Sequence, residues 1–238
     1  MKLFPKLQVV AVVGLLVSCA ANDPLKIPSP ASMVTRAEVI ATAYTYTQVT
    51  WTPEARHMKH GDDGNGISVH TPDLSLNRKG FANGWWEPGK PAKGMPYQWG
   101  GFDTPQGFLK SLENGEFAGD ISTRSKRTLG DDGTSRKACG IDCSGFVSRC
   151  WRLDRPYSTK ELPSISNPLK SSLQLLAGDI LLNDKHVLIF KDWSHDMKSM
   201  LVYEAGPYPV WRVNAAEIPV KKLDTEGYVA WRYVGIRD

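Results

Sequence analysis

The sequence predicts an α+β fold in which a cysteine-bearing helix packs on an antiparallel β-sheet. Helical signals come first, because Thr35-Arg36-Ala37-Glu38 has the form of a capping box and opens a helix that ends at about Gln48. After Ser172 the chain consists of short apolar runs separated by turn residues, a pattern typical of strands. Helices followed by strands favour a layout with helices on one face of an antiparallel sheet.

The first expected helix is amphipathic. Its apolar residues recur at spacings of three and four and should form the buried face: Ala37, Ile40, Ala41 and Tyr44. Residues 51–96 are dense in Gly, Pro, Asn and Asp and should form loops with few regular elements. A second, short helix is expected over residues 104–114, where Gly115 stops it.

The second half of the chain should begin with an exposed segment. Residues 123–137 contain five basic and two acidic side chains, which predicts a polar excursion just before the cysteine helix. This excursion would line a substrate cleft or form a solvated insertion. Four apolar runs farther along should pair as antiparallel strands: residues 179–182, 187–190, 200–204 and 227–233.

Length and composition suit a single catalytic core. The chain has 238 residues, 41% of them hydrophobic, which is ordinary for one globular domain. Its net charge of +4 is spread along the sequence without a basic run, so nothing indicates nucleic-acid binding. A mild positive charge weakly favours association with anionic polymers or membrane surfaces.

Residues 1–19 have the form of an export signal that ends in a lipobox. Two lysines precede the apolar run 9–17, which is too short to span a bilayer. The end of this segment, Leu-Val-Ser-Cys19, resembles a bacterial lipobox, in which the cysteine receives diacylglycerol; an ordinary signal peptide is the alternative. Residues 20–33, rich in proline and small polar residues, should form a flexible tether, and residues 34–238 the folded domain.

Three cysteines lie close together in the folded domain, at Cys139, Cys143 and Cys150. An odd number of cysteines in an exported domain indicates a free thiol or an intermolecular pair. A zinc site is one alternative, although no second ligand cluster accompanies these cysteines. A disulfide between Cys139 and Cys150, which would leave Cys143 as the single thiol, is another.

Cys143 has the surroundings of a nucleophile. It stands at the expected start of a helix, where unpaired backbone N–H groups favour the thiolate. Asp142 and Ser144 are good residues for a helix start, and Gly145 permits close approach of another backbone or of a substrate. Cys150, on the inward side of the helix, should be a small buried apolar residue.

His186 is the expected general base. Histidine exchanges a proton near neutral pH, and His186 begins the apolar strand HVLIF, from which it can be directed at a helix start. A third polar group must orient the imidazole. Glu204 lies on the next expected strand, and a hairpin around residues 192–199 would place it beside His186.

Four segments together resemble the NlpC-type cell-wall cysteine peptidases, a family with a papain-like fold. In chain order they are Tyr97-Gln98-Trp99-Gly100-Gly101, Asp142-Cys143-Ser144-Gly145-Phe146-Val147, Ala177-Gly178-Asp179-Ile180 and His186-Val187-Leu188-Ile189-Phe190. The resemblance runs from about residue 97 to 238. It departs from the family in the long insertion at about 102–140 and in the glutamate at the third position.

The resemblance implies a role for each matching residue. Cys143 corresponds to the nucleophile, His186 to the base and Tyr97 to a tyrosine that helps to hold the oxyanion. Asp142 and Ser144 correspond to residues of the pocket that receives the free amine of the stem peptide, although helix capping alone would also account for them.

The implied activity is hydrolysis of amide bonds in peptidoglycan stem peptides, including the bond between D-glutamate and diaminopimelate. No cofactor or metal is implied. The partners would be stem peptides and, through the lipid on Cys19, a membrane: the periplasmic face of the outer membrane in a host with two membranes. The alternatives are another thiol amidase or acyltransferase, and a catalytically idle, lipid-anchored binding protein.

Two metal sites are weaker alternatives in the loop region. The run Asp62-Asp63-Gly64-Asn65-Gly66 resembles part of a calcium loop but lacks the closing glutamate. His57, His60 and His70 could form a transition-metal site, although solvated loop histidines are the simpler interpretation.

Overall fold

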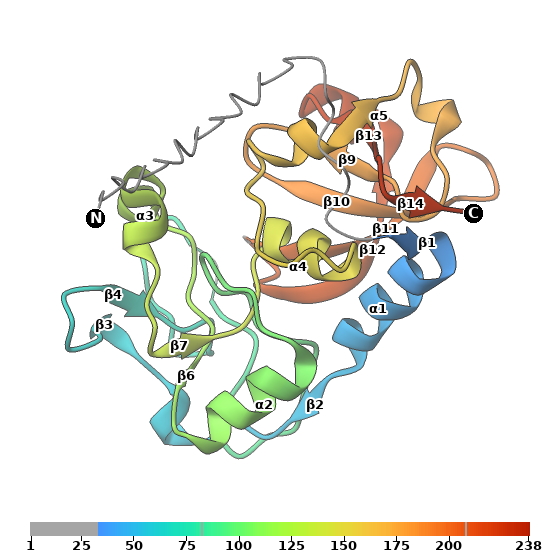
Figure 1. Ribbon diagram of the computed structural model, residues 1–238. Helices are drawn as coiled ribbons and strands as arrows, with labels where there is room; N and C mark the ends of the chain where they lie inside the picture. The colour runs from blue at the N-terminus through green and yellow to red at the C-terminus, as the bar shows by residue number, and fades with distance from the viewer. Residues whose placement is uncertain (1–32, 82, 208) are drawn as a thin grey trace, which may run out of the picture.

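The chain is built around a six-stranded antiparallel sheet with the strand order β12-β11-β10-β9-β13-β8 (Figure 1). The computed structural model describes residues 33–238 except 82 and 208, so the expected signal with Cys19 and nearly all of the tether lie outside the described residues. The strands of this sheet are β8 (Ser166–Pro168), β9 (Ile180–Leu182), β10 (Val187–Trp193), β11 (Ser199–Gly206), β12 (Arg212–Pro219) and β13 (Val229–Tyr233).

Five helices and four small sheets complete the described part of the chain. The helices are α1 (Arg36–Gln48), α2 (Pro105–Glu113), α3 (Arg124–Leu129), α4 (Cys143–Cys150) and α5 (Val220–Thr225). The small sheets pair β1 (Val34–Thr35) with β14 (Ile236–Arg237), β2 (Thr50–Trp51) with β5 (Ala92–Lys93), β3 (His60–Asp62) with β4 (Ser68–His70), and β6 (Phe117–Ala118) with β7 (Ala138–Cys139). The α+β class and the antiparallel sheet are therefore confirmed.

Both faces of the main sheet are buried, because successive side chains along each strand point to opposite faces. Val187 and Ile189 of β10 and Tyr203 of β11 belong to the larger core, which includes α1 and α4. Leu188 and Val202 belong to a second core that α5 covers on the opposite side. Below and to the left of the sheet in Figure 1 lies a second region, with α2 at the bottom, α3 at the left and the strands from β2 to β7. The four expected strands are present, whereas β8 and β12 were not expected.

Helix α1 begins as expected, but the expected buried face is wrong. Thr35 Oγ1 accepts the N–H of Glu38 at 3.2 Å, and the Thr35 N–H donates to the Glu38 carboxylate at 2.8 Å. The buried residues are Val39, Ala43 and Tyr46, which are also spaced by four and three. Ala37, Ala41 and Tyr44 are exposed and Ile40 is half-buried, since α1 turns its other stripe toward α4 and β12. The spacing rule fitted both stripes.

The expected helix over residues 104–114 is α2, capped by Thr104, whose Oγ1 accepts the Gly107 N–H at 2.9 Å. The exposed excursion expected at 123–137 is confirmed in part. The segment folds into α3 and a 3-10 turn, and six of its seven charged side chains are exposed: Arg124, Arg127, Asp131, Asp132, Arg136 and Lys137. Lys126 is the exception: it is buried with its Nζ 2.6 Å from Asp120 Oδ2, because a charged group inside a protein needs such a partner. Among residues 33–238, gaps excluded, no helix is long and apolar enough to cross a membrane.

Candidate active site

Helix α4 begins at Cys143, as the sequence predicted. Asp142 is the N-cap, and its Oδ1 accepts the Gly145 N–H at 2.6 Å and the Ser144 hydroxyl at 3.1 Å. Cys143 is 7% exposed, so only a small part of the residue is accessible to solvent. Its thiol lies at the start of the helix, beside the N–H groups of the first helical turn.

The turn before α4 is tied to the Y-x-W-G-G segment. Asp142 Oδ2 accepts the Gly100 N–H at 3.1 Å, and the Asp142 N–H donates to the Gly101 carbonyl at 3.2 Å. A Cβ atom on Gly145 would lie 2.2 Å from that carbonyl oxygen, so only glycine fits here. The expected close approach of a backbone at Gly145 is thus confirmed, and it fixes the start of α4 against the segment that contains Tyr97.

His186 and Glu204 meet through the hairpin of β10 and β11. Ile189 pairs with Tyr203 in this hairpin, which places Glu204 opposite the start of β10. His186 Nε2 lies 2.8 Å from Glu204 Oε2, and both side chains are nearly buried. The His186 N–H donates to Asn183 Oδ1 at 2.8 Å, which holds the strand end in place. The expected proximity of these two side chains is confirmed.

The imidazole of His186 is held in its charged form. Burial alone lowers the pKa of His186, but the negative charge and hydrogen bonding of Cys143, followed by those of Glu204, outweigh burial and raise the pKa to about 10. Because Nε2 contacts Glu204, the buried Nδ1 is the nitrogen left for the thiol. The geometry therefore places His186 between Cys143 and Glu204, with Nε2 bound to the carboxylate, which is the arrangement in which a carboxylate stabilises an imidazolium.

Tyr97 lies close to this pair. Its backbone bridges to Ile141, just before α4, and its ring packs edge-on against Trp211 with centroids 5.6 Å apart. Burial, and then the charges of Cys143 and Asp142, raise the pKa of Tyr97, while a hydrogen bond with Ser122 works in the opposite direction. The phenol therefore stays protonated at neutral pH and is able to donate a hydrogen bond near the thiol.

Asp142 and Ser144 are occupied by contacts within the protein. Both carboxylate oxygens of Asp142 accept hydrogen bonds from the chain, and the Ser144 hydroxyl donates to one of them. Burial raises the pKa of Asp142, and these hydrogen bonds lower it. Capping of α4 and attachment of the Gly100 turn account for the observed contacts, and an additional role in binding a substrate amine stays a prediction.

Three residues that the sequence did not single out surround the His186–Glu204 pair. The Nδ2 of Asn214, on β12, lies 3.4 Å from Glu204 Oε1. Burial raises the pKa of Tyr228, and the charges of Glu226, Glu204 and Cys143 raise it further. Asn183 hydrogen-bonds the Tyr228 side chain. No local pattern marks these residues, because only the pairing of distant strands brings them together.

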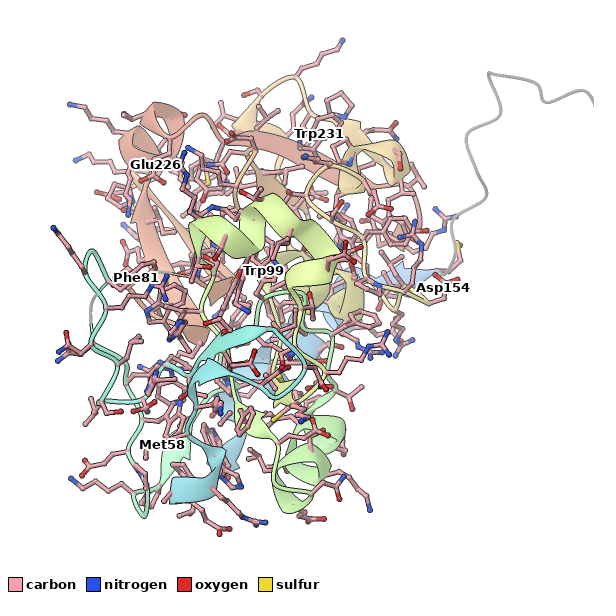
Figure 2. The ribbon with its side chains drawn as sticks, turned by 90° about the vertical axis from the view of Figure 1, so that its left-hand side faces the viewer. Met58, Phe81, Trp99, Asp154, Glu226 and Trp231 are labelled. Atoms are coloured by element: carbon pink, nitrogen blue, oxygen red, sulfur yellow. The ribbon has the colours of Figure 1, made fainter. Side chains whose placement is uncertain are left out.

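The insertion packs beside the site rather than extending from it. Asp120 accepts the His70 N–H at 3.0 Å, and Lys126 also donates to the Gly133 carbonyl at 3.0 Å. Burial raises the pKa of Asp120 to about 7, although Lys126 acts to lower it. Figure 2 looks onto α3, with Trp99 beside it, and the indole N–H of Trp99 donates to the Gly130 carbonyl at 3.1 Å. The insertion thus braces the Y-x-W-G-G segment.

The other cysteines are free thiols in this structure, so the alternative disulfide between Cys139 and Cys150 is absent from it. Both are buried, and burial raises the pKa of each, with nearby Asp103 and Glu116 adding to the effect at Cys139. Cys143 is thus the one cysteine of the three at a helix start beside a histidine.

The loop residues considered for metals have protein partners. The carboxylate of Asp63 accepts the Asn65 and Ile67 N–H groups and the Ser135 hydroxyl. His57 is buried against the Leu112 carbonyl, at 3.0 Å, which contradicts the expectation of a solvated loop residue. Within the ranges that the structure describes, no group of three or more His, Cys, Asp or Glu side chains is arranged to hold a metal ion.

Comparison with known proteins found no family model, no curated protein and no solved structure that matches this chain.

Proposed function

We propose that this protein is a cysteine endopeptidase with a papain-like arrangement of helix and sheet, which hydrolyses amide bonds in peptidoglycan stem peptides. The observation that carries the proposal is the buried His186, bound to Glu204 at 2.8 Å through one nitrogen and subject to the charge of Cys143 on its other side. A nucleophile, a base and an orienting carboxylate in this order are what thiol acyl transfer requires.

The proposed reaction has two halves. The Cys143 thiolate attacks the amide carbonyl carbon, and the resulting oxyanion accepts hydrogen bonds from the Cys143 N–H and the Tyr97 hydroxyl. The imidazolium of His186 then gives its proton to the departing amine, and a thioester remains on Cys143. Water attacks the thioester after His186 takes one of its protons, and the carboxylic acid leaves as the thiolate is restored.

The stem-peptide substrate comes from the resemblance of four segments to NlpC-type peptidases, and export to the cell wall is consistent with it. Incubation of the protein with purified peptidoglycan, followed by mass analysis of the soluble fragments, tests the activity. We expect fragments from the wild type and none from Cys143→Ala. Cys139→Ala, at a buried thiol away from His186, is the matched control and should retain cleavage if it folds. Fragments released equally by Cys143→Ala would refute the proposal.

Attachment to a membrane through a lipid on Cys19, to the outer membrane in a host with two membranes, is the second part of the proposal. A labelled fatty acid should enter the wild-type protein in cells and should be absent from Cys19→Ala. Equal labelling of the two proteins would contradict the lipobox interpretation but would leave the proposed hydrolase unaffected.

A further inference from the structure

Asp120 of the insertion holds the backbone of the segment that carries Tyr97. Its N–H donates to the Tyr97 carbonyl at 2.9 Å, and its carbonyl accepts the Trp99 N–H at 2.9 Å, so the two chains run side by side like parallel strands at this point. Tyr97 also bridges to Ile141, two residues before Cys143. The backbone of Tyr97 is therefore fixed between Asp120 and the chain that leads into α4.

The side chain of Asp120 is anchored in turn by Lys126 of α3. Lys126 Nζ lies 2.6 Å from Asp120 Oδ2 and donates to the Gly133 carbonyl at 3.0 Å, while Asp120 Oδ1 accepts the His70 N–H at 3.0 Å. Both charged side chains are buried, and Asp120 is the only carboxylate in an ion pair with Lys126 within the described part of the chain. Each oxygen of the carboxylate thus has a fixed partner.

A buried ion pair of this kind is a weak source of stability. Replacement of such a pair by apolar side chains of similar size is often neutral or stabilising, because the desolvation of two charges offsets their attraction. A carboxylate that accepts a charged donor and a main-chain donor in fixed directions does, however, restrict its own residue to one geometry. The pair of Lys126 and Asp120 is therefore better explained by the geometry that it imposes on Asp120 than by stability.

We propose that Lys126 is a positioning residue for the proposed reaction: through Asp120 it holds Tyr97 where the phenol donates to the oxyanion. This inference rests on the proposed function. It gives the insertion a role in catalysis that goes beyond a cleft wall or a solvated insertion. An oxyanion donor acts only within hydrogen-bond distance of the developing charge, and a displacement of about 1 Å lowers the rate by about 100-fold. Lys126 itself does not contact the substrate.

A double-mutant cycle separates positioning from folding. The rate of fragment release is measured at pH 7.5 over a series of concentrations of purified peptidoglycan, for the full-length chain, Lys126→Met, Tyr97→Phe and the double variant, each shown to be folded by urea unfolding. Lys126→Met should lower kcat at least tenfold and change KM less than twofold. In the Tyr97→Phe background it should lower kcat less than twofold, because no phenol is then left to position. Arg124→Met, which removes an exposed charge from the same helix, should leave kcat within twofold of the wild type.

Equal decreases in kcat in the two backgrounds would overturn the inference, because a purely structural role of Lys126 would lower both alike. If Lys126→Met does not fold, Lys126→Met combined with Asp120→Asn, which leaves no unpaired charge, takes its place in the cycle. Nuclear magnetic resonance provides a check without turnover: the ring resonances of ¹³C-labelled Tyr97, assigned with Tyr97→Phe, should shift in Lys126→Met and not in Arg124→Met.

Ring resonances of Tyr97 that stay unchanged in Lys126→Met would also overturn the inference. Absence of cleavage by the wild type would instead overturn the proposed hydrolase, and the Tyr97 resonances would then decide by themselves whether Lys126 positions the phenol.

Discussion

The charge state of His186 provides a quantitative test of the site. Its pKa of about 10, against an ordinary 6.5, corresponds to ~5 kcal/mol in favour of the imidazolium at ~1.36 kcal/mol per pH unit. Burial opposes the charged form, so the attraction from Cys143 and Glu204 together exceeds this figure. Of the two, Cys143 contributes more. We therefore expect Cys143→Ala to lower the pKa of His186 further than Glu204→Gln does.

The assay is a pH titration of the protein labelled with ¹⁵N in its five histidines, with His186→Gln used to assign the resonance. In the wild type, His186 should stay charged through neutral pH and lose its proton near pH 10. In Cys143→Ala the deprotonation of His186 should move toward pH 6.5 or below, because only the Glu204 carboxylate is then left to raise the pKa against the effect of burial. A pKa still near 10 in Cys143→Ala, or a larger decrease in Glu204→Gln, would refute the thiolate–imidazolium description.

Three further changes test the structure around the site. Lys126→Met should destabilise the protein by about 3–5 kcal/mol at pH 8, and by less at pH 5, in urea unfolding. The raised pKa of Asp120 lets the folded state keep a proton that the unfolded state releases above about pH 4, so the free energy of unfolding should fall as the pH rises through 7. A loss of stability that does not depend on pH would contradict this. Asp179→Asn, at a fully buried carboxylate between two arginines, should lower the free energy of unfolding by about 3 kcal/mol, while Asp224→Asn, at an exposed position, should lower it by less than about 0.5 kcal/mol. Equal decreases would argue against the pairing of Asp179 with the arginines. Gly145→Ala should reduce kcat/KM at least tenfold, because its methyl group would collide with a backbone carbonyl 2.2 Å away, and unchanged kinetics would show that the start of α4 tolerates the shift.

The parts of the site that the sequence predicts correctly depend on short-range signals. Asp142 and Gly145 mark the start of α4 through a cap and a close backbone approach, both within one helical turn. His186 and Glu204 meet because a short hairpin joins two apolar runs, and antiparallel pairing then determines which residues are opposite. The α+β class follows from the same order of helical and strand signals.

The parts that were missed depend on contacts between distant segments. Lys126 looks like a solvated residue in a polar run, and only its 2.6 Å contact with Asp120 makes its burial possible. In α1 two stripes have helical spacing, and only the packing of α1 against α4, where Tyr46 contacts Phe146, distinguishes them. Strand β12 lacks a clean alternation of apolar and polar residues, because Ala215 and Ala216 are adjacent, and only its pairing with β11 brings the Asn214 amide beside Glu204.

The pairing of β1 with β14 has a mechanical consequence. Strands β1 and β14 lie side by side (Figure 1), with Val34 paired to Ile236 in parallel. Arg36 contacts Asp238 at 2.6 Å and the buried Asp179 at 3.0 Å. A pulling force on residue 33 would therefore pass as shear into residues 236–238 and into the base of β9. Strand β10 meets that path at its middle, where the Phe190 N–H donates to the Asp179 carbonyl at 2.8 Å, and not at the end that follows His186. Tension on the N-terminal segment should first separate β1 from β14 and leave the reactive pair aligned.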